Sequence, residues 1–382
     1  MTNRPIRILQ WGMGDNRGGV ESFMFQLYRM MDREQVQFDF LASHDAPKLA
    51  YEDEVKAFGA NVYRVIYSQR ESPTKAKTCL RKFFTAHPEI VGLHMHANFP
   101  YAAPMKYAKE AGIGMRILHS HNSAKSGEEH GIVQKTVALL RQFPVRYGID
   151  HYPSAYFACS DKAAEFMFPG KPFTWIRNGI DTNRFAFDEG IRNRVRTELH
   201  LHPDQPVLGF CGRLDDQKNP MMLMRIFAEY KKRYPQAHLL VVGHGQMQEE
   251  MVSYAKYQGL TDCVSFLGGN RDDVNELYQA MDAFVMPSRF EGLPIVGIEA
   301  QCAGLPCVVS AEAVPRSTDV SGLMTFVSIM QSPETWVKAI ELSMNGHSRS
   351  MNYAMAVRQA GFDMADVAAR MQQYYLDNAC RS

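Results

Sequence analysis

The sequence predicts an α/β fold with two domains, each a parallel sheet with helices on both faces. Three observations support this prediction. The chain has 382 residues, which is enough for two domains of ordinary size. Short apolar runs alternate with segments of helical spacing through the first half. The same alternation starts again near residue 207.

In the first half, apolar runs predict strands at 6–11, 36–41, 61–66, 90–95, 115–119 and 155–160. Between them, helical spacing predicts one helix that starts near Gly19 and others at 51–58, 74–86, 101–111 and 130–147. Ligands of such sheets bind beyond the carboxyl ends of the strands. We therefore look for functional residues in the loops that follow strands.

In the second half, strands are predicted at 207–211, 238–243, 264–268, 283–286 and 305–310. Helices are predicted at 221–234 and 274–281, from Pro294 onward, and at 334–344, 351–360 and 364–379. Between the halves, Asn178-Gly179 permits a tight turn with positive φ. These features predict domains at 1–185 and 186–360, followed by a terminal helical segment at 361–382.

Charge and cysteine usage limit the function classes. Net charge is only +1, which gives no electrostatic reason to expect nucleic acid as a partner. The seven cysteines include no C-x-x-C pair, which indicates free thiols in a reducing compartment. No apolar run approaches the ~18 residues that span a bilayer. We therefore expect a cytoplasmic protein.

Glu291 and Glu299 flank a predicted loop-to-helix junction, where Gly292 and Pro294 follow the strand at 283–286. Free N–H groups and the positive end of the helix dipole collect at such a junction, which suits a phosphate. Carboxylates beside an anion site are unusual unless they accept hydrogen bonds from hydroxyls. A nucleotide sugar offers both phosphates and hydroxyls.

Arg213 and Lys218 lie in the loop that follows the strand at 207–211. A guanidinium can clamp two phosphate oxygens and an ammonium supplies a point charge, so the pair suits a pyrophosphate. The alternative is a solvated basic loop.

Two other ligand classes find less support. The run Gly12-x-Gly14-x-x-Arg17 lacks the third glycine of a dinucleotide fingerprint, although Asp39 is at a plausible distance for a ribose contact. Three H-x-H pairs could each present two ligands on one strand face: His94/His96, His119/His121 and His200/His202. No third ligand is evident near any pair, so we predict structural histidines and no metal site.

Several motifs together resemble the retaining GT-B glycosyltransferases of family four. Glu291 and Glu299 match the E-x(7)-E pattern of that family, within the run Ser288-Arg289-Phe290-Glu291-Gly292-Leu293-Pro294. The resemblance extends over nearly the whole chain: Gly18-Gly19-Val20-Glu21, the strand-end His121, Asn178-Gly179-Ile180-Asp181, and the Arg213/Lys218 loop. The V-E-S-F-M and H-S-H-N runs look most like bacterial exopolysaccharide or capsule enzymes.

The resemblance implies a GT-B fold, two Rossmann-like domains facing each other across a cleft, with the last helix returning to the first domain. Arg213 and Lys218 would neutralise the diphosphate, Glu299 would accept the ribose hydroxyls and Glu291 the sugar hydroxyls. The N–H groups of Gly292 and Leu293 would assist, and Gly18 and Gly19 would let the backbone approach the phosphates. His121 would contact the sugar or the reacting region of the acceptor, with His119 as the alternative.

The implied function is retaining transfer of a sugar from a nucleotide-diphosphate donor to a lipid-linked saccharide in cell-surface polysaccharide synthesis. No D-x-D run occurs, so we expect neither metal nor cofactor. A sugar-nucleotide epimerase or a glycan phosphorylase is an alternative, as is a non-catalytic partner subunit. The complete set of candidate charges argues against the last.

The predicted helix from Pro73 to His87 carries four cations, Lys75, Lys77, Arg81 and Lys82, beside Leu80, Phe83 and Phe84. Cations with neighbouring aromatic residues suit an anionic bilayer surface, which suggests peripheral contact with the inner face of the membrane. The alternative is that the three apolar residues pack on the sheet.

Overall fold

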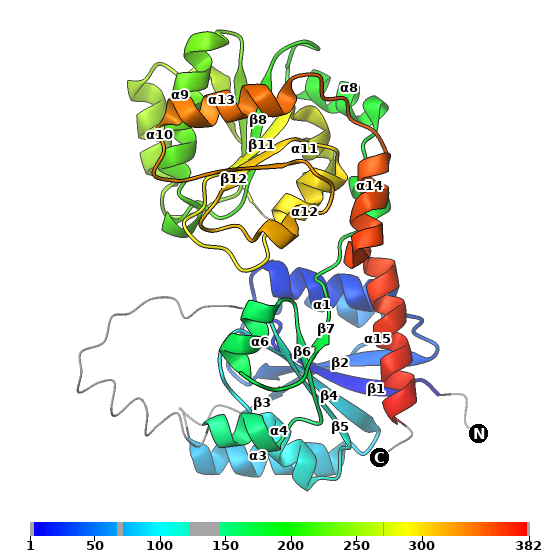
Figure 1. Ribbon diagram of the computed structural model, residues 1–382. Coiled ribbons are helices and arrows are strands. Elements are labelled where there is room, and N and C mark those ends of the chain that lie inside the picture. The colour runs from blue at the N-terminus through cyan, green and yellow to red at the C-terminus, as the bar shows by residue number, and fades with distance from the viewer. Residues whose placement is uncertain (1–3, 67–71, 122–144, 270, 380–382) are drawn as a thin grey trace, which may run out of the picture. The chain divides into compact units, whose positions relative to one another are not determined.

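The computed structural model describes residues 4–66, 72–121, 145–269 and 271–379 (Figure 1). The chain forms two compact units: residues 1–179 with 364–382, here unit 1, and residues 180–363, here unit 2. Each unit has its own sheet, and every strand pair is parallel in the described part of the chain. The predicted α/β fold with two parallel-sheet domains is confirmed. Most of the helix predicted at 130–147 falls outside the described residues.

The sheet of unit 1 has the strand order β3-β2-β1-β4-β5-β6-β7. Its strands are β1 (Ile6–Trp11), β2 (Val36–Ser43), β3 (Val62–Val65), β4 (Ile90–Ala97), β5 (Met115–Ser120), β6 (Ala155–Ala158) and β7 (Thr174–Trp175). Its helices are α1 (Gly19–Met30), α2 (Glu52–Ala57), α3 (Pro73–Ala86), α4 (Ala103–Glu110), α6 (Asp161–Met167) and α15 (Met364–Ala379).

Alternation along the strands gives this sheet two apolar faces. On one face, Ile8 and Phe38 pack with α1 and α15, which bring Leu27 and Met371 into the core. On the other, Leu9 packs with residues from α3, α4 and α6 (Figure 1). The last helix α15 therefore completes the core of unit 1, with Tyr375 fully buried.

The helix α3 corrects one expectation. Its N-terminus is capped by the Ser72 hydroxyl, which accepts from the Lys75 N–H at 3.3 Å, and Pro73 takes the first helical position. Leu80, Phe83 and Phe84 are buried against the sheet, so they offer no apolar surface to a bilayer. The four cations, Lys75, Lys77, Arg81 and Lys82, stay on the exposed face, and Arg81 pairs with Glu110.

The sheet of unit 2 has the order β10-β9-β8-β11-β12-β13. Its strands are β8 (Val207–Cys211), β9 (His238–Val242), β10 (Val264–Phe266), β11 (Ala283–Met286), β12 (Cys307–Ser310) and β13 (Met324–Val327). Its helices are α7 (Thr182–Phe185), α8 (Glu189–Glu198), α9 (Pro220–Arg233), α10 (Gln248–Tyr257), α11 (Val274–Ala280), α12 (Ile295–Cys302), α13 (Pro333–Met344) and α14 (Asn352–Val357), with short 3-10 turns at 216–218, 261–263 and 316–318 and a π-helical turn at 358–362.

The division between the units falls at Gly179 rather than at the predicted residue 185. Ile180 donates its N–H to the Phe362 carbonyl at 2.8 Å and packs in a small core with residues of α12 and α14. The Thr182 hydroxyl also bonds to the Asp363 carboxylate. These contacts assign the segment from Ile180 onward to unit 2. No helix in the described ranges is both long enough and apolar enough to span a membrane.

Candidate functional site

Two loops of unit 2 carry most of the predicted site residues. The β8 loop (residues 212–219) and the β11 loop (residues 287–294) follow strands that are neighbours in the sheet. Gln217 joins them, because its carbonyl accepts from the Arg289 N–H at 2.8 Å and its amide nitrogen donates to the Phe290 carbonyl at 3.1 Å. Asn219 adds a bond to the Pro287 carbonyl at 3.1 Å. The two loops are thus one connected structure at the carboxyl edge of the sheet.

Lys218 and Glu291 form an ion pair across these loops. Lys218 Nζ donates to Glu291 Oε1 at 2.6 Å, and the side chains are only 12% and 5% exposed. The sequence predicts separate ligand contacts for these two residues, whereas in the structure they pair with each other. The attraction between two charges this well shielded from water is stronger than the attraction in an exposed surface pair.

Arg213 is 69% exposed at its side chain. Its Nη2 donates to Gln217 Oε1 at 2.9 Å and lies 3.3 Å from Asp215 Oδ2. Asp215 in turn caps the short turn that holds Lys218, because its carboxylate accepts from the Lys218 N–H. Arg213 is therefore tethered to its own loop while its guanidinium remains accessible to an anion.

Glu299 lies on α12 and is largely shielded from water. Burial raises the pKa of Glu299 to about 7, and a hydrogen bond from the Tyr278 hydroxyl to Oε2 at 3.0 Å opposes that rise. Tyr278 is on the neighbouring helix α11. A carboxyl group with this pKa can accept a hydrogen bond from a ligand hydroxyl, or donate one when protonated.

The segment before α12 supplies backbone donors. Pro294 is the cap residue rather than the first helical residue that the sequence predicted, and α12 begins at Ile295. Within the described residues, the N–H groups of Gly292 and Leu293 have no hydrogen-bond acceptor. Together with the dipole of α12, they favour an anion at this point.

In unit 1, Gly18 and Gly19 lie at the start of α1. A Cβ at Gly18 would stand 2.6 Å from Glu21 Oε2, whereas one at Gly19 would meet no atom within 4 Å. Glu21 Oε1 accepts from the Gly14 N–H at 3.2 Å, and burial raises the pKa of this carboxyl group. The open approach to the backbone is therefore at Gly19, while Gly18 lies beside a carboxyl group.

Asp39, the ribose candidate of the dinucleotide alternative, has a structural partner. It is fully buried on β2 and accepts from Arg7 Nε at 2.7 Å and from the Asn61 N–H at 2.7 Å. The structure gives no support to a ribose contact at this residue.

The prediction that no third ligand lies near the H-x-H pairs is wrong. The strands β4 and β5 are neighbours with His96 opposite His119, so ligand nitrogens of His94, His96 and His119 lie within 4.8 Å of one another. Hydrogen bonds already use several of the ring nitrogens in this cluster. His94 Nδ1 bonds to the Tyr375 hydroxyl at 2.6 Å and His94 Nε2 to His119 Nδ1 at 3.2 Å. Burial holds the pKa of each of the three well below its usual value, so all are neutral.

The structure also distinguishes His121 from His119. His119 is a β5 residue with no exposed surface, in ring contact with Phe23 and Phe157. His121 follows the last residue of β5 and keeps some exposed surface. Burial lowers the pKa of His121 to about 3, so its imidazole is neutral near pH 7. Of the two histidines, only His121 keeps exposed surface.

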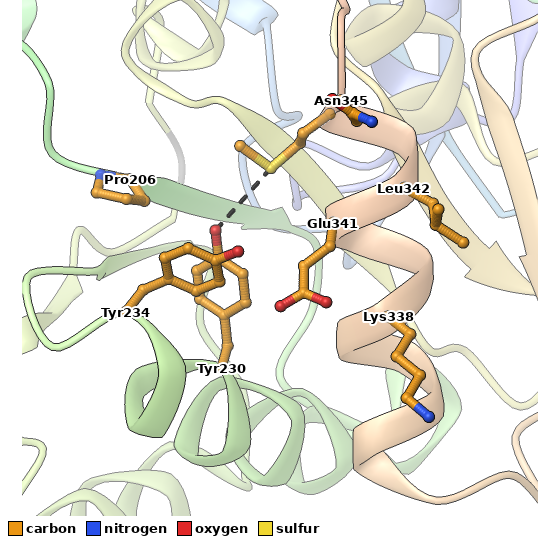
Figure 2. A pocket seen from close by; sticks show the side chains of 8 residues that line it. Pro206, Tyr230, Tyr234, Lys338, Glu341, Leu342 and Asn345 are labelled. Carbon is orange, nitrogen blue, oxygen red and sulfur yellow. Dashed lines mark hydrogen bonds between the residues drawn. The ribbon is translucent and has the colours of Figure 1, made fainter.

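A groove of unit 2 lies apart from these residues (Figure 2). It is lined by Pro206, Tyr230, Tyr234, Lys338, Glu341, Leu342, Met344 and Asn345. Pro206 precedes β8 and Tyr234 follows α9, so the groove lies at the amino edge of the sheet. In such sheets ligands bind at the opposite, carboxyl edge, where the β8 and β11 loops lie.

Comparison with known proteins agrees with the motifs. The model "Glycosyltransferase Family 4" matches residues 17–184, and "Glycosyl transferases group 1" matches residues 192–360. The Escherichia coli UDP-Gal:alpha-D-GlcNAc-diphosphoundecaprenol alpha-1,3-galactosyltransferase is 34% identical over 324 residues, which cover 81% of this chain and 80% of that protein. The putative glycosyltransferase EpsF of Bacillus subtilis is 29% identical over 381 residues, which cover 98% and 97%.

Solved structures agree on the fold. Anabaena Alr3699/HepE, solved in complex with UDP, has a TM-score of 0.76 at 17% identity, covering 97% of this chain and all of that one. WaaG, a glycosyltransferase of lipopolysaccharide biosynthesis, has a TM-score of 0.65 at 16% identity, covering 96% and 99%. These matches confirm the predicted family and fold: the chain belongs to the family 4 glycosyltransferases and has their GT-B fold.

Proposed function

We propose that this glycosyltransferase moves a sugar from a nucleotide-diphosphate donor to a saccharide acceptor, with retention of the anomeric configuration. The observation that carries the proposal is the connected pair of loops in unit 2. They place the shielded Lys218–Glu291 pair and the free N–H groups of Gly292 and Leu293 in adjoining segments. Cations and N–H groups suit a diphosphate, and carboxyl groups suit hydroxyls.

In this proposal Lys218 and Arg213 stabilise the negative charge that builds on the diphosphate as it leaves. Lys218 is held in a shielded site, so its charge needs little reorganisation during the reaction, which makes it effective. The cations take the role that a bound metal has in other transferases, so the reaction proceeds without a metal or cofactor. Glu299 accepts the ribose hydroxyls, and Tyr278 holds the carboxyl group in place for them.

The Lys218–Glu291 pair suggests how the donor enters. A diphosphate offers Lys218 new acceptors, which releases the Glu291 carboxylate for the sugar hydroxyls. The exchange leaves neither charge unpaired, which matters because an unpaired buried charge costs several kcal/mol, roughly 3–5.

The names of relatives suggest the substrates. The Escherichia coli relative is named for a UDP-galactose donor and a diphosphoundecaprenol-linked acceptor, and HepE was solved with UDP-glucose. We propose a UDP-sugar donor and a lipid-linked saccharide acceptor in cell-surface polysaccharide synthesis. The protein would work in the cytoplasm, at the inner face of the membrane, with α3 contacting anionic lipid through its exposed cations alone.

Liposome co-sedimentation tests the membrane contact. Each cation near an anionic surface contributes about 1 kcal/mol, so binding should be weak and should fall with salt. A variant with the four cations of α3 changed to Gln (Lys75, Lys77, Arg81 and Lys82) should lose most of it. Equal recovery of both proteins with anionic vesicles would contradict the role of α3.

A thermal-shift panel of UDP-, GDP- and ADP-sugars tests the donor, because a ligand of the native state raises its stability by mass action. One nucleotide series should shift the wild-type midpoint, and Lys218→Met should reduce that shift. Product analysis with the best donor then separates the functions: transfer that needs an acceptor supports the proposal. An isomerised donor sugar would favour the epimerase alternative, and no turnover would favour a non-catalytic subunit.

A further inference from the structure

A chain of hydrogen bonds runs through the core of unit 1 from β1 to the end of β5. His96 Nε2 lies 2.9 Å from Gln10 Oε1, and His96 Nδ1 lies 2.9 Å from His121 Nε2. Gln10 and His96 are 1% and 2% exposed. Neither residue belongs to the motifs that carry the family resemblance.

The chemistry of these three side chains defines which atom donates in each hydrogen bond. A neutral imidazole has one N–H donor and one acceptor nitrogen. The amide oxygen of Gln10 can only accept, so His96 carries its proton on Nε2. His96 Nδ1 must then accept, so His121 carries its proton on Nε2. The remaining nitrogen of His121, Nδ1, keeps a lone pair.

We propose that Gln10 and His96 are positioning residues that hold His121 in the Nε2-protonated tautomer, so that Nδ1 accepts a hydrogen bond from a hydroxyl of a saccharide ligand. This inference rests on the proposed sugar transfer, together with the role that the family resemblance implies for His121, which is contact with the sugar or with the reacting region of the acceptor. His121 Nδ1 is buried and has no hydrogen-bond partner among the described residues. A buried polar atom of this kind ordinarily has a partner, and a ligand hydroxyl would supply one.

The orientation of His121 is also restricted. The backbone N–H of His121 donates to the Ala97 carbonyl at 3.3 Å, and the backbone carbonyl of His121 accepts from the Cys159 thiol at 3.6 Å. Its ring lies 4.0 Å from the ring of His119 and 5.4 Å from that of Phe23. The Asn178 side chain lies near enough to raise the pKa of His121, although burial has the larger and opposite effect. Rotation of the ring would break the bond to His96.

The first test needs no ligand and no activity. Nitrogen-15 NMR of the histidine side chains distinguishes a protonated ring nitrogen from an unprotonated one, and the His121 signals are assigned by their absence in His121→Asn. We expect Nε2 of His121 to be protonated and Nδ1 to be unprotonated in the wild-type protein. Protonation at Nδ1 would overturn the proposal.

Variants then test the positioning residues. Gln10→Met keeps the length of the side chain but removes the acceptor, so His121 should become a mixture of tautomers. Gln37→Met is the matched control, because Gln37 is a hydrogen-bonded residue of β2 in the same sheet and has no contact with His121. An unchanged His121 tautomer in Gln10→Met would overturn the role of Gln10.

Kinetics connect the tautomer to transfer. Gln10→Met should lower kcat about tenfold with little change in KM, in line with one lost hydrogen bond. His96→Leu should do the same, and His96→Asn should recover much of the loss, because its amide oxygen stands near the former Nδ1. If the tautomer changes while transfer does not, the contact of His121 with a saccharide hydroxyl is refuted and the positioning of its tautomer stands.

Discussion

Glu291→Gln should strengthen the binding of a free nucleoside diphosphate while it lowers transfer. In the structure Lys218 Nζ donates a hydrogen bond to the Glu291 carboxylate at 2.6 Å, so a diphosphate that binds Lys218 must compete with Glu291 for the ammonium group. The amide of Gln competes less well for a cation. The same substitution removes the charge that we assign to the sugar hydroxyls, so the donor sugar loses a contact that the free diphosphate never makes.

The size of the effect follows from the pair. A hydrogen bond between charged groups contributes about 1.5–3 kcal/mol net. We take the lower end for two reasons. Lys218 remains 12% exposed, and water can replace part of the bonding that the Glu291 carboxylate loses when it releases Lys218. About 1.5 kcal/mol corresponds to roughly tenfold tighter binding. Lys218→Met should weaken binding by at least a similar factor, since the diphosphate then loses the cation itself.

Isothermal titration calorimetry with UDP provides the measurement, and the double variant is its control. Once Lys218 is replaced, Glu291 has no cation to release, so Lys218→Met/Glu291→Gln should bind UDP as Lys218→Met does. Additive effects would mean that the two side chains act independently. If Glu291→Gln weakens UDP binding as much as Lys218→Met does, Glu291 contacts the nucleotide and the exchange argument fails.

Three further predictions concern the stability of unit 2 and the metal dependence of transfer. Burial raises the pKa of Glu299 from 4.5 to about 7, so the native state loses stability as pH rises through this range. Glu299→Gln should therefore stabilise unit 2 by about 1–2 kcal/mol above pH 7, a range that allows for the partial exposure of Glu299 to water. Hydrogen exchange of unit 2 measures this gain in stability, and it should show none at pH 4.5. Arg349→Met should cost roughly 2 kcal/mol in thermal unfolding, because the Ala303 and Tyr278 carbonyls lose their side-chain donor. The other two carbonyls that Arg349 contacts keep a bond from Arg192, and an unchanged midpoint would contradict the prediction. Transfer should persist in excess chelator, and a requirement for manganese or magnesium would refute the roles of Arg213 and Lys218.

The strands with the strongest apolar runs were predictable from the sequence. The segments Ile6–Trp11 and Val207–Cys211 became strands with the predicted bounds, because each is buried on both faces of its sheet. The helix α10 was not predicted. It buries only Met251 and Ala255, and so few apolar positions do not define a helical face. The strand β13 was also missed, since two of its four residues are only partly buried.

The contacts of the site were less predictable than its residues. Lys218 and Glu291 are 73 positions apart, and His94 and Tyr375 are 281 apart. These pairs meet because of strand order and because α15 returns to the first sheet. Local propensity and spacing contain neither fact. The third histidine of the buried cluster was missed for the same reason, since it comes from a neighbouring strand.

The helix α3 shows a different limit. Apolar residues at helical spacing beside a row of cations are typical both of a helix that packs on a sheet and of one that lies on a membrane. The apolar stripe is the same in the two cases, so the pattern cannot distinguish them. In the structure that stripe is used by the core, where Phe84 is only 3% exposed. Any membrane contact of α3 therefore depends on charge alone and should be sensitive to salt.

The pairing of Lys218 with Glu291 has a consequence for selectivity between donor and product. A free nucleoside diphosphate can take the ammonium of Lys218 but leaves the carboxylate of Glu291, which is 5% exposed, without its cation. A nucleotide sugar supplies partners for both groups, since its hydroxyls can bond to the released carboxylate. Leaving a shielded charge unpaired costs more than a hydrogen bond gains. The pair to which we assign donor binding would therefore weaken the binding of the diphosphate product once the sugar has left, which favours its release.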